Sequence, residues 1–133
     1  MTDTHRFRRL AVAGVGATLA AMVATGLVAA LARAAGVDLE VDSGEAIPVS
    51  GIVFQTGVFS LVGVVIAAAL LRWSARPAER FVWTAVSLTA ISLVPPLLFG
   101  TGADTIATLI GLHLVAAAVM IPSVSQAIRT SCR

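Results

Sequence analysis

Four long apolar runs divide this chain, at residues 10–31, 51–71, 81–98 and 105–122. An α-helix needs about 20 residues, rising about 1.5 Å each, to cross roughly 30 Å of hydrocarbon, and every run is close to that length. The chain is 58% hydrophobic and 12% charged, and its 133 residues are too few to bury such an excess in one core. We therefore expect an all-α membrane protein, a single domain built as an antiparallel bundle of four transmembrane helices.

The first apolar run also has features of a secretory signal peptide. Arg6, Arg8 and Arg9 precede it, and residues 32–34 imitate a small-x-small cleavage site. The apolar core of a signal peptide is about 7–15 residues long, however, and this run is longer. We expect it to be retained as the first transmembrane helix.

The nine basic residues are all arginine, and their distribution predicts the orientation of the chain. They gather before the first run, in the turn at residues 72–80 and in the C-terminal tail, while the other two loops hold Arg33 and most of the acid. Short arginine-rich loops stay in the cytoplasm, so we expect a plasma-membrane protein with both termini cytoplasmic. The scatter of the arginines between apolar runs also argues against a nucleic-acid partner, despite a pI near 10.

The loop between the first two runs, residues 33–50, carries most of the acidic side chains. Apolar and acidic residues alternate from Val37 to Asp42, a period of two that suits a short strand or a lip on the membrane surface. The spacing of Asp38, Glu40 and Asp42 is similar to that of a calcium loop, but the glycine falls one place late and the final glutamate is missing. We expect a solvated extracytoplasmic loop and leave a weak cation site open.

Small residues and prolines predict how the helices pack and end. The first run holds a ladder at i, i+4 spacing, which suits close helix packing inside the bundle or, as an alternative, at a dimer seam. Its members are Ala13, Ala17, Ala21, Thr25 and Ala29. Gly36 is expected to end the first helix. Pro95 and Pro96 are expected to kink or end the third helix, and Asp104 to cap the fourth.

His113, near the middle of the fourth run, is a functional candidate because an ionisable group inside a membrane is costly. It could bind haem or a metal, take part in a proton path, or stay neutral and bond to a hydroxyl of a neighbouring span. Haem b in a bundle normally takes two histidines, and His5 lies outside the spans, so His113 of a second copy would be needed. A metal site lacks further ligands at membrane depth, and a proton path lacks a carboxylate there. We therefore favour a neutral histidine bonded to Ser87, Ser92 or Thr84.

Hydroxyl and amide side chains on the second and third runs could line a small midplane cavity with His113. The candidates are Gln55, Thr56, Ser87 and Ser92. Such hydroxyls more often bond to carbonyls of their own helix or join neighbouring helices. The sequence shows no nucleophile–base pair, so we predict no catalytic residues, no metal site and no cofactor.

Several segments give the chain a family resemblance. They are GVDLEV in the acidic loop, RPAERFVW in the arginine-rich turn, SLVPP at the end of the third run and LHLVAAAVMIP in the fourth. In these features the chain resembles an actinobacterial family of small four-span integral membrane proteins of unknown function, some labelled cell-envelope biogenesis proteins. The resemblance covers the first run to Pro122 and implies the fold and a membrane location. It brings no catalytic residues.

The sequence thus favours a non-enzymatic accessory or scaffolding component of the cell envelope, in contact with the lipid bilayer. Small-residue helix faces would allow a homodimer or a larger membrane complex. Two alternatives remain: a small transporter or ligand-binding bundle with a polar cavity near His113, and a haem- or quinone-linked membrane subunit.

The predicted orientation can be tested by labelling single cysteines introduced at Ser43 and Ser74, in a chain whose Cys132 is replaced by serine. A membrane-impermeant thiol reagent should reach the two positions from opposite sides of the membrane, Ser74 from the cytoplasm. Labelling of both positions from the same side would rule out this threading.

Overall fold

The computed structural model describes residues 2–42 and 44–133, and in this part of the chain every regular element is a helix. The helices are α1 (Asp3–Ala34), α2 (Val49–Trp73), α3 (Pro77–Ser92), α4 (Val94–Phe99) and α5 (Ala103–Ser131). Since α3 and α4 together form one rod, four helical segments are long and apolar enough to cross a membrane. This confirms the predicted all-α fold with four membrane-spanning helices.

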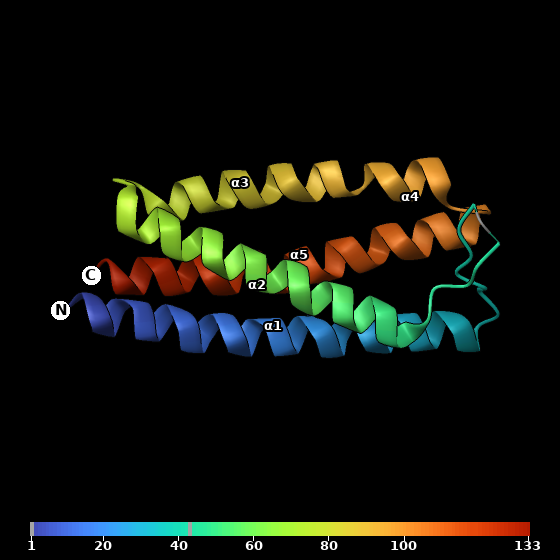
Figure 1. Cartoon of the computed structure of the whole chain (residues 1–133), viewed down its shortest axis with the longest axis horizontal. Coiled ribbons are helices and arrows are strands. Elements are labelled where there is room, and N and C mark those ends of the chain that lie inside the picture. Colours follow the sequence, from blue (N-terminus) through green and yellow to red (C-terminus); the bar gives the residue numbers. More distant parts are fainter. Residues whose placement is uncertain (1, 43) are drawn as a thin grey trace.

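Both termini lie at one end of the bundle, together with the connection from α2 to α3 (Figure 1). The loop from α1 to α2 and the turn from α4 to α5 lie at the other end. We call these the arginine-rich end and the acidic end, after the side chains that the helix ends and loops carry there. The four rods are antiparallel to their sequence neighbours, as short connections between spans require.

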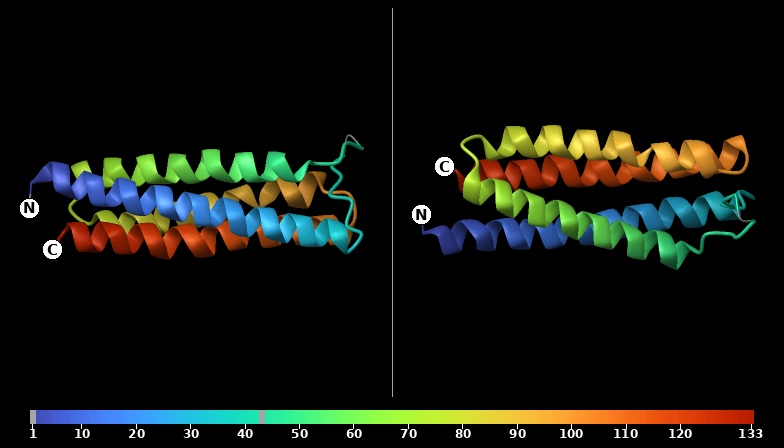
Figure 2. Two further views of the ribbon diagram at one scale, coloured as in Figure 1. Left: turned by 90° about the horizontal axis from the view of Figure 1, so that it is seen from below. Right: turned by 45° about the horizontal axis from the view of Figure 1, so that its top comes forward.

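The four rods run side by side along one common direction (Figure 2). Within the described chain, α1 packs against α2 and α5, α3 packs against the same two helices, and α1 and α3 are not in contact. Helices α2 and α5 also touch across the centre. The rod formed by α3 and α4 is the least buried of the four.

The small-residue ladder of α1 is buried, as internal helix packing predicts. Ala21 and Ala29 are fully buried, and Ala17 and Thr25 almost so. Ala17 and Ala21 join a cluster with Leu10, while Ala29 packs in a separate cluster toward the acidic end. Four of the five ladder residues are therefore covered by this chain's own helices, and Ala13 is half-buried at the edge of the bundle.

Glycines bring α1 and α2 close together. A Cβ atom added at Gly14 would stand 2.7 Å and 2.8 Å from the two methyl carbons of Val64. Gly26 and Gly57 make similar approaches to Val53 and Met22. Each contact sets a larger side chain into the space a glycine leaves, which gives the van der Waals packing that holds helices together in lipid.

The acidic loop forms two isolated bridges and no strand among its described residues. Glu40 pairs with Ala46, and Val41 pairs with Gly100 of the α4–α5 turn. The extended conformation that the alternation predicts is interrupted at Leu39, whose positive φ of 53° turns the chain and whose side chain is fully buried. Leu39 packs with residues of α1, α2 and α5 and closes the acidic end of the bundle. The period-two pattern therefore corresponds to one buried leucine between less buried acidic neighbours and not to a strand.

The ends of α1 and α3 lie where the glycine and prolines predict, and the start of α5 does not follow the prediction. Helix α3 ends at Ser92, ahead of Pro95 and Pro96, as predicted, and Gly36 follows the end of α1 with a φ of 91°. Asp104 does not cap α5: Gly102 holds the cap position, with no side-chain hydrogen bond, and Asp104 lies in the first turn. A carboxylate there still favours the positive end of the helix dipole.

Helix α5 continues through Pro122 to Ser131, well past the predicted end of the apolar run. Proline removes one backbone donor, yet a helix tolerates the loss where nearby hydroxyls and packing compensate. The hydroxyls of Ser123 and Ser125 donate to the carbonyls of Val119 and Pro122 in this turn. The continuation brings the end of α5 alongside the start of α1.

We predict that Gly14→Ala destabilises the protein by about 1–3 kcal/mol, since the added methyl meets a stiff β-branched valine. Gly57→Ala should cost less, because Met22 is flexible and can move aside. Gly16→Ala is the matched control: nothing lies within 4 Å of a Cβ there, so stability should not fall. Unfolding in mixed detergent micelles measures all three, and equal losses at Gly14 and Gly16 would contradict this packing.

Candidate functional site

His113 is half-buried on α5, and its ring bonds to its own helix. The Nδ1 atom lies 2.7 Å from the carbonyl oxygen of Leu109, one turn earlier. A carbonyl can only accept, so Nδ1 carries the hydrogen, and in the neutral ring Nε2 is left as an acceptor. The predicted bond to Ser87, Ser92 or Thr84 of a neighbouring helix is not among the hydrogen bonds of the described chain: Ser92 donates to its own helix and Ser87 is exposed.

The other cavity candidates make no hydrogen bond to His113 in the described chain. Gln55 and Ser87 are exposed on the outer surfaces of α2 and α3. Ser92 donates to the carbonyl of Thr89 in its own helix, at 2.7 Å. Gln55, Ser87, Ser92 and His113 thus belong to three helices, and their side chains differ in exposure and in hydrogen-bond partner.

Thr56 is the exception, because it meets a polar partner on another helix. Its hydroxyl donates to the carbonyl of Ile52 at 2.8 Å, which leaves its oxygen free to accept from the Thr25 hydroxyl at 3.1 Å. Thr25 has one hydrogen and a second acceptor nearby, the carbonyl of Ala21 at 2.9 Å. The hydrogen bond between the two hydroxyls links α1 to α2, so the role of this pair is structural.

Thr18 carries an unpartnered hydroxyl in the middle of α1. It is 4% exposed, and its Oγ1 atom has no hydrogen-bond partner in the described chain. It lies one turn after Gly14 on the side of α1 that packs against α2. Leaving a buried hydroxyl unpaired typically costs about 1–3 kcal/mol, so this is a point of weakness in an otherwise satisfied interface.

The described residues of the acidic loop do not form a cluster of metal ligands. Among the described residues, no three His, Cys, Asp or Glu side chains come together in a way that could hold a metal ion. The loop is instead tied to the neighbouring turn: Thr101 donates from both its backbone N–H and its hydroxyl to the carbonyl of Glu40, at 3.3 Å and 2.8 Å. Arg33 donates to the carbonyl of Ile47 at 2.6 Å.

Charge is divided between the two ends of the bundle. By their place on the helix ends and connections, eight of the nine arginines lie at the arginine-rich end with two carboxylates, Asp3 and Glu79. The acidic end has one arginine and five carboxylates. Counting side chains alone, the formal charge is therefore +6 at one end and −4 at the other.

The start of α1 is fastened to the end of α5 at the arginine-rich end. The Arg6 guanidinium donates through Nε to the carbonyl of Ser131 at 3.1 Å, and the Ser131 hydroxyl lies 3.5 Å from the carbonyl of Arg6. An arginine at the last carbonyls of a helix also complements the negative end of its dipole. This contact fixes the spacing of the two helix ends.

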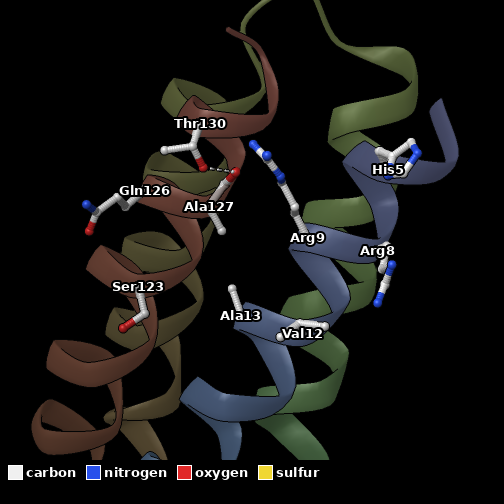
Figure 3. Close-up of a pocket in the computed structure, with 9 residues that line it drawn as sticks. All are labelled: His5, Arg8, Arg9, Val12, Ala13, Ser123, Gln126, Ala127 and Thr130. Atoms are coloured by element: carbon white, nitrogen blue, oxygen red, sulfur yellow. Dashed lines mark hydrogen bonds between the residues drawn. The ribbon is translucent and has the colours of Figure 1, made fainter. Parts of the chain in front are cut away.

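A groove of about 690 Å³ opens between these helix ends (Figure 3). Arg9 extends between α1 and α5 toward the end that bears Thr130, while Arg8 and His5 lie on the side of α1 away from α5. Ser123 lines the opposite part of the groove from His5, and its hydroxyl is bonded to Val119, so the two do not form a catalytic pair.

The sequence analysis missed this groove. Its lining comes from two strips, each at helical spacing, one on α1 and one on α5. The groove forms only because α5 continues past Pro122, and the sequence analysis did not predict this continuation. The signal was the run of residues 123–131, which contains no glycine or further proline to stop a helix.

Four antiparallel apolar helices, charged ends and hydroxyls satisfied mostly within their own helices define a small multi-pass membrane protein. The chain belongs to a family of unknown function, DUF6069, which matches residues 5–130. No curated protein and no solved structure matches it. The family's unknown function agrees with the expected resemblance, and the four apolar helices of this chain agree with the small membrane protein that the resemblance implied.

The threonine pair gives a test of the α1–α2 interface. In a double-mutant cycle, Thr25→Val and Thr56→Val should show a coupling of about 0.6 kcal/mol, because each removes the other's partner. Thr89→Val, combined with Thr56→Val, is the control, since the Thr89 hydroxyl donates to Ala85 of its own helix. Unfolding in detergent measures the coupling, and equal coupling in both cycles would contradict the interhelical bond.

Proposed function

We propose that this protein is a non-enzymatic accessory or scaffolding component of the plasma membrane, which binds a partner helix through the outer face of α2. Both termini are placed in the cytoplasm, following the arginine distribution. The single observation that carries the proposal is the position of Gln55.

Gln55 is exposed on the outside of α2 and makes no hydrogen bond to the described chain. It lies about 9 Å along the helix from Val49, by the helical rise. Its neighbours Phe54 and Phe59 are 69% and 64% exposed, so the surroundings are those of a lipid-facing surface. An amide that finds no partner in hydrocarbon is costly, and a second transmembrane helix can supply the partner.

The remaining polar groups inside the spans favour a binding role over chemistry. The hydroxyls of Thr89, Ser92, Thr108 and Ser123 each donate to a carbonyl of their own helix. The ring of His113 is held in the same way. Polar groups that bond to their own backbone stabilise the helix that carries them. The Gln55 amide has no such partner and is able to bond to a second helix.

A competing explanation is that Gln55 reaches the nearer membrane surface. Side chains on a helix tilt toward its N-terminus, and for α2 that is the acidic end, where headgroups would be closest. In that case the amide is satisfied by water or headgroups, and no partner is needed. The two explanations differ in what happens when the amide is removed.

We expect the protein, extracted from its native membrane in a mild detergent, to copurify with a stoichiometric membrane partner. Gln55→Leu should lower the recovered partner about threefold to tenfold, since an intramembrane hydrogen bond is lost. Ser87→Leu is the control, because it removes a polar side chain that is also exposed on the outer surface of a span, α3, and lines neither groove. The partner can be quantified by mass spectrometry against the amount of this chain.

Three outcomes would decide the matter. Loss of partner in Gln55→Leu alone supports the proposal, and a partner that is a second copy of this chain makes the complex a homo-oligomer. Equal recovery in both variants shows that Gln55 reaches the surface. A monodisperse particle without any partner contradicts the scaffolding role.

A further inference from the structure

The groove between α1 and α5 has the charge and position of a lipid headgroup site. Arg8 and Arg9 line it, and neither forms an ion pair within the described chain. The lining contains no carboxylate. Two guanidiniums without acidic neighbours at the mouth of a groove are complementary to an anion.

The groove changes character along its length. His5, Arg8, Arg9 and Thr130 stand toward the ends of the helices, and Val12 and Ala13 continue the strip into the apolar run. Val12 is 68% exposed, which leaves an apolar surface open beside the charged mouth. This order, charged at the helix end and apolar deeper, is that of a phospholipid at the membrane interface.

The depth agrees with a headgroup. Leu10 is 1% exposed and begins the core cluster at this end, so Arg8 and Arg9 stand just outside the apolar part of the bundle. A volume of about 690 Å³ exceeds that of a single small anion and leaves room for a larger group.

The geometry points to a binding site for one anionic phospholipid of the leaflet at the arginine-rich end. Its phosphate sits beside Arg9 in the groove, with Arg8 adding positive charge at the mouth. The Thr130 hydroxyl borders the site and donates its hydrogen to the carbonyl of Ala127 at 3.0 Å. One acyl chain runs along Val12 and Ala13 toward the middle of the membrane. The Arg6–Ser131 contact sets the width of the site by holding the two helix ends at a fixed spacing.

A second groove at the same end does not have this character. It lies between the α2–α3 connection and the end of α5, and Glu79 contributes a carboxylate to its lining. Arg76 is paired with that carboxylate at 3.6 Å. Arg129 and Arg133 also line the second groove, so the grooves differ in the carboxylate that only the second contains. For that reason the α1–α5 groove is the better anion site of the two.

The test is retention of lipid by the full-length protein. The protein is reconstituted in vesicles of phosphatidylcholine with one fifth phosphatidylglycerol, extracted in detergent and examined by native mass spectrometry. We expect one phosphatidylglycerol molecule to remain bound per chain, and no enrichment of phosphatidylcholine. The double variant Arg8→Gln/Arg9→Gln should lower this retention about tenfold or more.

The matched control is Arg72→Gln/Arg80→Gln, which removes the same charge from the same end at two residues that line neither groove. It should retain lipid as the parent does. Thermal unfolding of both variants in detergent shows that the fold is kept. Equal loss of lipid in the two double variants, or unchanged retention in Arg8→Gln/Arg9→Gln, would overturn the proposal.

A further arm separates a lipid from a free phosphate. Inorganic phosphate at millimolar concentration during extraction should not displace the bound phosphatidylglycerol, because the acyl chain holds it along Val12 and Ala13. Displacement by phosphate would show that the groove binds a soluble anion and would refute the lipid site.

Discussion

Each backbone or side-chain polar group placed in hydrocarbon must find its partner inside the protein, because lipid tails offer none. The hydroxyls of this bundle meet that requirement mainly by bonding to carbonyls one turn back, as Thr89 and Ser123 do. The imidazole of His113 uses the same solution through Leu109. Against this background the groups without a partner are the informative ones, and Thr18 and Gln55 stand out for opposite reasons. Thr18 is buried among helices, whereas Gln55 looks outward.

Close contact between α1 and α2 depends on where the glycines lie more than on how many there are. Gly14, Gly26 and Gly57 each accept a side chain from the facing helix, while Gly16 and Gly63 face open space. In lipid, helices gain no hydrophobic free energy by associating. The van der Waals contact between each glycine and the side chain that faces it therefore supplies attraction that burial of apolar surface would supply in water. The α1–α2 pair is joined further by Thr25 and Thr56. The rod of α3 and α4, with little of its surface covered, is held more lightly.

The sequence was sufficient to predict the spans, the buried ladder of α1 and the break before Pro95, because each depends on local chemistry alone. Hydropathy shows where a helix must lie, and small residues at i, i+4 show which side is covered. The course of α5 beyond Pro122 was not predicted, since an apolar-run criterion ends where polar residues begin although the helix does not. The α1–α5 groove was missed for that reason. The partner of His113 was missed too, because a backbone carbonyl competes with hydroxyls and leaves no mark in the sequence.

The uneven charge of the two ends has a consequence for how the molecule is made. Arginine stays protonated at any physiological pH, so turning the bundle over would carry eight guanidiniums through hydrocarbon. No thermal fluctuation of a folded bundle achieves that on a cellular timescale. Whichever direction the first helix takes during insertion is thus permanent. Each molecule therefore keeps the threading it acquired during synthesis.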